Sequence, residues 1–373
     1  MEPITLKVDE LRIRPWQESD LPALTAAYAD PEIIRRMMMP QPWGPEHSRN
    51  FIAHSRNRWD ADSPRWAVVD DNDTLLGGVG LTAYPQDEYA VMYWTTPEAR
   101  GRNVATRALR EACRFAFDQI PNSHRLYWDA IVGNHLSRLV ALKVGFQEEG
   151  ITREGGYQRG TWRDLWVGGM LRRDFREAGE EIDAYPRLAA RAALFHGPQP
   201  TVDLDFKGAH LRPLSEDDLD DLTTTCQTPE VQKWTTVPRH YTRDDAVARL
   251  QAAQHQWTLG NGATWAISDQ AGRYCGTVGI HMHKWHEPAA WIDFYAAPWA
   301  RGQGLMTPAL QALTEFSSQQ MRNDWLDWGA YAGNDASWHL AKKVGFAWHG
   351  IKQVPWRYDR TKKVDIWKAS LLH

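Results

Sequence analysis

The stretch Asn134-His135-Leu136-Ser137, which leads into Lys143-Val144-Gly145-Phe146, recurs 200 positions later as Asn334-Asp335-Ala336-Ser337 and Lys343-Val344-Gly345-Phe346. The chain is therefore an internal duplication. Each copy is far longer than a solenoid repeat, so each is large enough to bury a core of its own. We expect any site built by one copy to have a counterpart in the other.

The repeat extends toward both ends of each copy. Ile13-Arg14-Pro15 matches Leu211-Arg212-Pro213 at an offset of 198, and Arg100-Gly101 matches Arg301-Gly302 at an offset of 201. Such drift is expected where loops absorb single-residue insertions. Between the copies, the Ala-rich segment Tyr185–Phe195 predicts a helix. We therefore expect a first domain over residues 1–176, a partly helical linker over 177–205 and a second domain over 206–373.

The composition is that of an ordinary globular chain, with 43% hydrophobic and 24% charged residues. A formal charge of −4 gives no general attraction to nucleic acid or to acidic membranes. The sequence shows no export signal and no apolar run long enough to span a bilayer. Its three cysteines differ in position between the copies and form no CxxC pair, which predicts a reducing cytoplasm.

The expected elements of the first copy begin with strands and continue with alternating helices and strands. This order predicts an α+β or α/β layered fold with a central sheet, rather than a sandwich or a bundle. The expected strands are Arg65–Val69, Leu75–Leu81, Tyr89–Thr95, Arg125–Val132 and Leu165–Met170, and the expected helices are Leu21–Met37, Val104–Phe117 and Leu136–Val144.

Two matching glycine-containing turns, Arg100–Thr106 and Arg301–Thr307, each open a helix. Such a turn presents consecutive backbone N–H groups at the positive end of the helix dipole, where a pyrophosphate can approach closely. An ordinary capped helix start is the alternative. The spacing fits neither a P-loop nor a dinucleotide-binding fingerprint.

Taken together, the turn and the Asn-x-x-Ser to Lys-x-Gly-Phe stretch resemble the GNAT acyltransferase superfamily, and within it the subgroup that acetylates the N-termini of ribosomal proteins. The resemblance covers both copies. It implies two GNAT folds in tandem, each a mixed, mostly antiparallel sheet of about seven strands flanked by helices. The fourth and fifth strands would splay apart to admit the pantetheine arm of acetyl-CoA; they are Tyr89–Thr95 and Arg125–Val132, then Trp291–Ala297 and Trp325–Tyr331.

The same resemblance implies roles for individual residues. Ser137 and Ser337 would lie near the cofactor sulfur as catalytic groups, with helix capping as their alternative role. Asn134 and Asn334 would orient the cofactor. The other residues expected to bind acetyl-CoA are Trp94, Thr95, Arg100, Gly101, Arg102, Asn103, Val104, Ala105 and Thr106 in the first copy, and Tyr295, Ala296, Arg301, Gly302, Gln303, Gly304, Leu305, Met306 and Thr307 in the second.

A general base is sought among the carboxylates. Asp293 lies inside the apolar run Trp291–Tyr295, where an unpaired charge is costly, so we consider it as the base of the second copy. Its counterpart in the first copy is Met92, which leaves water or Glu88 for that copy. Direct attack of an amine on a thioester needs no covalent enzyme intermediate, which argues against a cysteine nucleophile.

Two departures from the family pattern separate the copies. Asn103 stands where glycine is usual, and Asn adopts left-handed backbone angles more readily than other non-glycine residues. Met306 stands where a small residue is usual, which makes the first copy slightly better suited as a cofactor site. The cluster His281–His286 is interpreted as a substrate-facing loop and not as a metal site, because no acidic or thiolate ligand accompanies it.

The sequence thus predicts an acetyl-CoA-dependent N-acetyltransferase that modifies a primary amine, either a protein N-terminus or a small molecule, without metal, nucleic acid or membrane. The alternative is an acyl-CoA-binding or sensory module in which one or both halves are catalytically silent. The acceptor, the acyl length, the number of active halves and the oligomeric state are left open.

Overall fold

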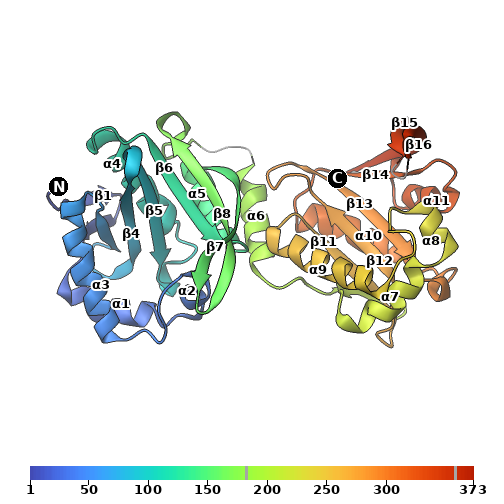
Figure 1. Ribbon diagram of the computed structural model, residues 1–373, viewed down its shortest axis with the longest axis horizontal. Coiled ribbons are helices and arrows are strands. Elements are labelled where there is room, and N and C mark those ends of the chain that lie inside the picture. The colour runs from blue at the N-terminus through green and yellow to red at the C-terminus, as the bar shows by residue number, and fades with distance from the viewer. Residues whose placement is uncertain (181–183, 357–358) are drawn as a thin grey trace. The chain divides into compact units, whose positions relative to one another are not determined.

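A computed structural model describes residues 1–180, 184–356 and 359–373, and these residues form two compact units (Figure 1). The division between the units falls in the stretch 181–183, which lies outside the described residues. Each unit contains one eight-stranded sheet flanked by helices. The α+β fold in two copies is as predicted, with eight strands in place of about seven.

The sheet of the first unit runs in the order β1-β2-β3-β4-β5-β6-β8-β7, and β5–β6 is its parallel pair. The expected strands Arg65–Val69 and Leu75–Leu81 form β3 and β4, which pair antiparallel. The additional edge strand β1 makes the splayed strands the fifth and sixth. The strands are β1 (Leu6–Val8), β2 (Leu11–Pro15), β3 (Arg65–Val69), β4 (Leu75–Tyr84), β5 (Glu88–Thr95), β6 (Arg125–Ile131), β7 (Gln147–Gln158) and β8 (Thr161–Leu171).

Helices cover both faces of this sheet, and each face has its own buried cluster of apolar side chains. The predicted helix Leu21–Met37 is two helices, because Asp30 caps a new one at Pro31 and accepts a hydrogen bond from the Ile33 N–H. The helices are α1 (Leu21–Ala27), α2 (Pro31–Arg36), α3 (Pro45–Asn57), α4 (Val104–Gln119) and α5 (His135–Val144).

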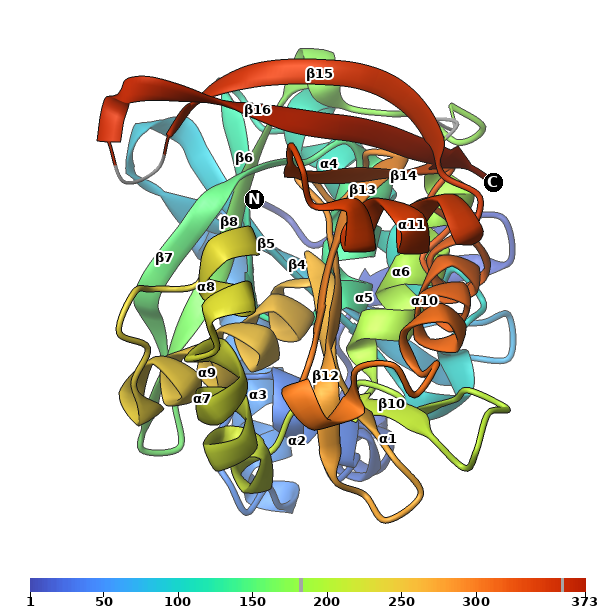
Figure 2. The same cartoon turned by 90° about the vertical axis from the view of Figure 1, so that its right-hand side faces the viewer.

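The second unit repeats this arrangement, with strand order β15-β16-β14-β13-β12-β11-β10-β9. Figure 2 shows α7, α8 and α9 on one side of its sheet and α10 and α11 on the other. The elements are α6 (Tyr185–His196), β9 (Val202–Asp203), β10 (His210–Pro213), α7 (Leu219–Cys226), α8 (Pro229–Trp234), α9 (Arg243–Leu259), β11 (Gly262–Ser268), β12 (Tyr274–His281), β13 (Ala289–Ala296), α10 (Met306–Gln319), β14 (Trp325–Tyr331), α11 (Asp335–Lys343), β15 (Ala347–Trp356) and β16 (Asp359–Leu372).

The predicted splay is present in both units. Strands β5 and β6 pair in parallel only from Glu88↔Arg125 to Ala90↔Tyr127, and β13 and β14 pair only from Ala289↔Trp325 to Trp291↔Asp327. Beyond these pairs the strands diverge. Residues 91–95 and 292–296 therefore have no strand partner on that side, which leaves backbone groups available for an extended ligand.

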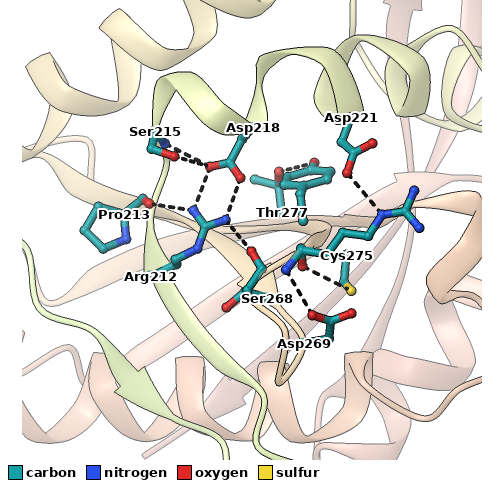
Figure 3. A network of polar contacts seen from close by, with 12 residues as sticks. Arg212, Pro213, Ser215, Asp218, Asp221, Ser268, Asp269, Cys275 and Thr277 are labelled. Atoms are coloured by element: carbon teal, nitrogen blue, oxygen red, sulfur yellow. Dashed lines mark hydrogen bonds and ion pairs between the residues drawn. The ribbon is translucent and has the colours of Figure 1, made fainter.

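An ion pair that occurs in both units holds the chain just before α1 in the first unit and just before α7 in the second. Arg14 donates two hydrogen bonds of 2.8 and 2.9 Å to Asp20, and Arg212 donates two of 2.6 and 2.7 Å to Asp218. Figure 3 shows Arg212 reaching from β10 to Asp218, which also accepts from the Ser215 N–H. Two parallel hydrogen bonds give this pair a defined geometry in addition to charge.

The predicted helix between the copies is present as α6, and it belongs to the second unit. Its Arg191 is fully buried and donates to the carbonyl oxygens of Met321 at 2.7 Å and Glu287 at 2.9 Å, to the Asn323 side chain, and to Trp285. Strand β9 pairs with β10. Residues 184–205, which include α6 and β9, thus lie in the second unit.

Replacing Arg191 by Met should lower the free energy of unfolding of the second unit by about 2–4 kcal/mol, because several buried acceptors lose their donor at once. Urea denaturation followed by tryptophan fluorescence measures this change. The exposed Arg173 of the first unit offers a control, and Arg173→Met should stay within about 0.5 kcal/mol of the parent. Equal costs for the two variants would contradict the assignment of α6 to the second unit.

Candidate active site

A cavity of about 1380 Å³ lies in the second unit, where β13 and β14 diverge. Pockets for drug-sized ligands are roughly 300–1,000 Å³, so this volume admits a large cofactor and an acceptor together. Its wall is built from α8, α9, β13, β14, α11 and the turn before α10. The lining includes the predicted residues Asp293, Tyr295, Ala296, Arg301, Gly302, Gly304, Leu305, Met306, Thr307, Asn334 and Ser337.

The turn before α10 has the open geometry expected of a phosphate site. Residues 301–304 are exposed, and Gly302 and Gly304 have φ angles of 75° and 84°. A side chain at Gly302 would meet no atom within 4 Å. Lys207 lies beside the turn and donates to the Gln303 carbonyl oxygen at 3.2 Å, which brings a cation that the sequence did not single out.

The first unit repeats this turn. Residues 100–103 are exposed, and Gly101 and Asn103 have φ angles of 74° and 59°. The expectation that Asn103 adopts left-handed angles is confirmed. Arg100 pairs with Asp30, just as Arg301 pairs with Glu230 at 3.3 Å in the second unit. The two arginines thus anchor their exposed turns to Asp30 at the start of α2 and to Glu230 of α8.

The Asn-x-x-Ser motifs begin α5 and α11. Asn134 and Asn334 are the N-caps, and their side-chain oxygens accept from the Ser137 and Ser337 N–H groups at 3.4 and 3.3 Å. Helix capping by the serines is therefore wrong, because the asparagines perform it. The serine hydroxyls instead accept from an indole N–H in each unit, Trp128 at 3.3 Å and Trp328 at 3.2 Å.

The two serine sites differ in one neighbour. In the first unit the Tyr93 hydroxyl donates to the Ser137 carbonyl oxygen at 2.8 Å and lies 2.9 Å from the Ser137 hydroxyl. Because the Tyr93 proton goes to the carbonyl, the serine proton goes to Tyr93. The second unit has Phe294 at this place in β13, and Ser337 lines the cavity. Only Ser337 thus keeps its proton for another acceptor.

The helical side of the gap in the first unit is filled by aromatic rings. Tyr28 lies 4.5 Å from Trp43 and 5.0 Å from Trp94 between ring centroids, and Trp16 lies 5.4 Å from Phe51. Trp16, Tyr28 and Trp94 are all buried. The Trp94 side chain, from a residue expected to bind the cofactor, is therefore a core element of this unit, as is Trp43.

The second unit carries smaller or polar residues at the same five places: Leu214, Cys226, Tyr241, Arg249 and Tyr295. Tyr241, Arg249 and Tyr295 line the cavity. Cys226 lies 3.8 Å from the Tyr295 hydroxyl, and burial raises the pKa of its thiol to about 11. Such a thiol is almost entirely protonated near neutral pH, which agrees with a reaction that uses no cysteine nucleophile.

Asp293 projects from β13 toward α9 and keeps 34% of its side chain exposed to the cavity. One carboxylate oxygen lies 2.8 Å from His281 Nε2, and the other lies 3.6 Å from the Arg249 guanidinium. Desolvation favours the neutral acid, but the His281 hydrogen bond and the charges of His281 and Arg249 outweigh it and lower the pKa of Asp293. Asp293 is therefore a fixed negative charge.

A chain of hydrogen bonds holds Asp293 from behind. Gln256 Nε2 donates to the Ile280 carbonyl oxygen at 2.9 Å and lies 2.9 Å from His281 Nδ1, while Thr264 donates to Gln256 Oε1 at 3.0 Å. The carbonyl fixes the amide orientation, so His281 Nδ1 accepts. In its neutral form His281 then carries its hydrogen on Nε2 and donates to Asp293. The histidine cluster thus contributes a supporting residue to the site.

Sequence reasoning missed Arg249 and Gln256 because it did not recognise α3 and α9 as helices. The available signal was the repeat itself: Gly44 and Thr242 are the N-caps of α3 and α9, and Phe51 and Arg249 each lie seven positions later. Glu88, considered as a base for the first unit, lies at the paired end of β5 and binds Arg125 at 3.1 Å. It is thus removed from the open part of the gap.

Residues 1–180, 184–356 and 359–373 contain neither a membrane-spanning helix nor a group of metal ligands. No helix within these ranges has both the length and the apolar character that a membrane crossing requires. Within the same ranges, no three His, Cys, Asp or Glu side chains are grouped as metal ligands. The cysteines Cys113, Cys226 and Cys275 are free and buried.

Comparison with known proteins identifies the family. The model described as an acetyltransferase (GNAT) domain matches the chain twice, over residues 10–147 and 209–347. These ranges make up most of the chain, so the chain belongs to the GNAT acetyltransferase family, a class of N-acetyltransferase enzymes. The family predicted from the two repeated motifs is confirmed.

Individual relatives are more distant. The Bacillus subtilis (strain 168) protein named "Putative ribosomal N-acetyltransferase YdaF" is 36% identical over 83 residues, which cover 22% of this chain and 45% of that protein. The chain thus matches less than half the length of this relative. "Uncharacterized N-acetyltransferase YoaA" from the same organism is 26% identical over 43% of this chain and 93% of its own length. A ribosomal-protein-S5-alanine acetyltransferase structure from Vibrio fischeri is 20% identical, covers 47% of this chain and 100% of its own, and has a TM-score of 0.42.

The lowered pKa of Asp293 predicts how acid affects the second unit. A carboxyl whose folded pKa lies below its ordinary value of 3.8 stabilises the fold above that value, and the contribution is lost as pH falls through the folded pKa. Asp293→Asn removes the contribution, so stability should fall less steeply between about pH 5 and pH 3 in the variant. Urea midpoints across this range test it, and parallel profiles for variant and parent would contradict it.

Proposed function

We propose that the second unit transfers the acetyl group of acetyl-CoA to a primary amine. The observation that carries this proposal is one continuous cavity, lined by the glycine turn 301–307, the unpaired part of β13, Ser337 and Asp293. A phosphate-binding element, an extended backbone edge, a hydroxyl and a carboxylate thus face a single space. This combination suits an extended thioester cofactor together with an amine that approaches the thioester group.

The residues of the second unit fit such a cofactor along its length. The exposed turn, with Arg301 and Lys207 nearby, would hold the pyrophosphate at the start of α10. The strand-free edge of residues 292–296 would hydrogen-bond the pantetheine arm as a neighbouring strand would. Met306 lines the cavity and packs against the core, so its length is accommodated there.

Acetyl-CoA supplies an activated acetyl group: a bond forms between the amine nitrogen and the carbonyl carbon, the C–S bond breaks, and the thiol leaves with a proton. Ser337 would direct its free hydroxyl proton to the departing sulfur. Asp293 would hold the incoming ammonium and pass its proton to water. Its lowered pKa makes it a weak base, because an effective one has a pKa near the operating pH.

The first unit is proposed to be the silent half. Its serine proton is engaged by Tyr93, and Tyr28, Trp43 and Trp94 occupy the side where an acceptor would enter. This reverses the expectation from the glycine turns alone, which favoured the first copy. The glycine turn and the splayed strands are retained in the first unit. In a sensory or scaffold role, this unit would bind acyl-CoA without turnover.

The acceptor is a primary amine on a small molecule or a protein N-terminus. The name of YdaF, which refers to a ribosomal acetyltransferase, favours a protein N-terminus, whereas the aromatic lining of the cavity favours a small molecule. The cytoplasm is the proposed compartment, and the three free, buried cysteines agree with it.

Separate serine variants assign the reaction to one unit. Ser337→Ala should lower kcat about tenfold or more, because the leaving thiolate loses its hydrogen-bond donor, while Ser137→Ala should stay within about twofold of the parent. Thiol release from acetyl-CoA across a broad amine panel, with mass spectrometry of the products, measures this. A large loss with Ser137→Ala and none with Ser337→Ala would place the reaction in the first unit.

A reciprocal pair of variants tests why the units differ. Phe294→Tyr should bring a hydroxyl to Ser337 as Tyr93 does to Ser137, and should lower kcat toward that of Ser337→Ala. Tyr93→Phe in the first unit should leave the rate unchanged. Full activity of Phe294→Tyr, in a protein whose unfolding is unaltered, would show that the engaged serine proton is not what silences the first unit.

A further inference from the structure

We propose that the acceptor is an α-amino carboxylate, an amine with a carboxylate one carbon away, whose two charged groups bind Asp293 and Arg249. This inference rests on the proposed function and names its substrate class. Charged side chains face the acceptor end of the cavity, and some of their hydrogen-bonding groups have no partner there among the described residues.

Arg249 is a cation with spare hydrogen-bonding capacity. It lines the cavity, its side chain is 26% exposed, and its ion-pair partner Asp293 lies at 3.6 Å, beyond hydrogen-bond length. Among residues 1–180, 184–356 and 359–373, the guanidinium has an ion pair with Asp293 and no hydrogen bond. Burial opposes this charge, but Asp293, together with Tyr295, Tyr241 and Tyr274, outweighs burial and raises the pKa of Arg249. The guanidinium thus stays charged and offers several N–H donors to whatever enters.

Asp293 supplies the opposite charge at a fixed place. His281 holds one of its oxygens, and the chain through Gln256 to Thr264 prevents the imidazole from turning away. Its second oxygen faces both Arg249 and the cavity. An ammonium group can therefore bind Asp293 while an anionic oxygen binds Arg249, and the short distance between the two side chains requires a ligand whose own charges are adjacent.

The neighbouring carboxylates already have hydrogen-bond donors, so Asp293 and Arg249 remain as the pair that can recognise the acceptor. Asp245, one turn earlier on α9, already accepts from the Thr242 N–H and hydroxyl at 2.8 and 2.9 Å. Across the cavity, Asp327 on β14 accepts from Ser370. The Arg249 guanidinium lies 3.6 Å from the acceptor-side carboxylate of Asp293, and a polyamine would place a second positive charge against it.

Aromatic and apolar residues at this end of the cavity lie beside two threonines and include Trp234, Val237, Pro238 and Tyr241. The side chain of the amino acid would lie along this wall, which favours apolar or aromatic amino acids over charged ones. The corresponding arginine is absent from the first unit, where Phe51 packs against Trp16. The recognition pair is thus confined to the unit proposed to be active.

Three acceptors that share one side chain test the proposal: phenylalanine, phenylalanine amide and phenethylamine, each with acetyl-CoA and the full chain. We expect kcat/KM to fall about 10- to 100-fold from the free acid to the amine, with the amide between them, because a charge-assisted hydrogen bond to Arg249 is lost. Equal or better use of phenethylamine would overturn the proposal.

Arg249→Gln should lower kcat/KM for phenylalanine about 10- to 100-fold and for phenethylamine less than threefold, whereas Arg249→Lys should retain part of the preference for the acid. Phe51→Leu, at the same helix position of the first unit, is the matched control and should leave the preference unchanged. An equal loss for acid and amine in Arg249→Gln would indicate a structural role and overturn the proposal. If Arg249→Gln does not fold, calorimetry of phenylalanine and phenethylamine with the parent and CoA decides, and equal affinities contradict the proposal.

Failure of this inference is separable from failure of the proposed function. Acetylation of other amines, with no discrimination among these three, overturns the substrate class and leaves the acetyltransferase in place. Absence of thiol release with every amine of a broad panel contradicts the acetyltransferase itself.

Discussion

The divergence of β13 from β14 after three residue pairs is the constraint on which the site depends. A strand in the middle of a sheet normally satisfies its backbone groups on both sides. Here residues 292–296 lose one partner, which opens the sheet and leaves an edge for an extended ligand. The turn before α10 and the N-terminus of α11 flank this opening, so the turn proposed to bind phosphate, the strand edge and Ser337 line one cavity.

Duplication preserved that constraint in both units while the side chains around it diverged. The first unit keeps the splay and the exposed turn, but its gap is closed on the helical side by packed aromatic rings and its serine is tied to Tyr93. The second unit replaces Phe51 by Arg249 and Met92 by Asp293, which converts an apolar core into a charged cavity wall. Both copies therefore share the backbone geometry, and a few side chains distinguish the copy that we propose to be active.

Much of this was readable from the sequence, because motifs bound to backbone geometry have fixed spacing. The glycine turns, the Asn-x-x-Ser caps and the strands that flank the splay all lie where the pattern predicts. The residues that surround Asp293 could not be predicted from the sequence. Its partners His281, Arg249 and Gln256 come from three elements, and α9 was not recognised as a helix, so no local pattern joins them. The packing of α6 was not readable for a similar reason: nothing in its sequence shows that Arg191 binds carbonyl groups more than ninety positions away.

Amide hydrogen exchange of the full chain with and without CoA tests the central claim most directly. The account predicts that CoA slows exchange in residues 301–307 and 292–296 of the second unit, where the pyrophosphate and the pantetheine arm would bind. Unchanged exchange in both segments at saturating CoA would contradict the assignment of this opening as the cofactor site.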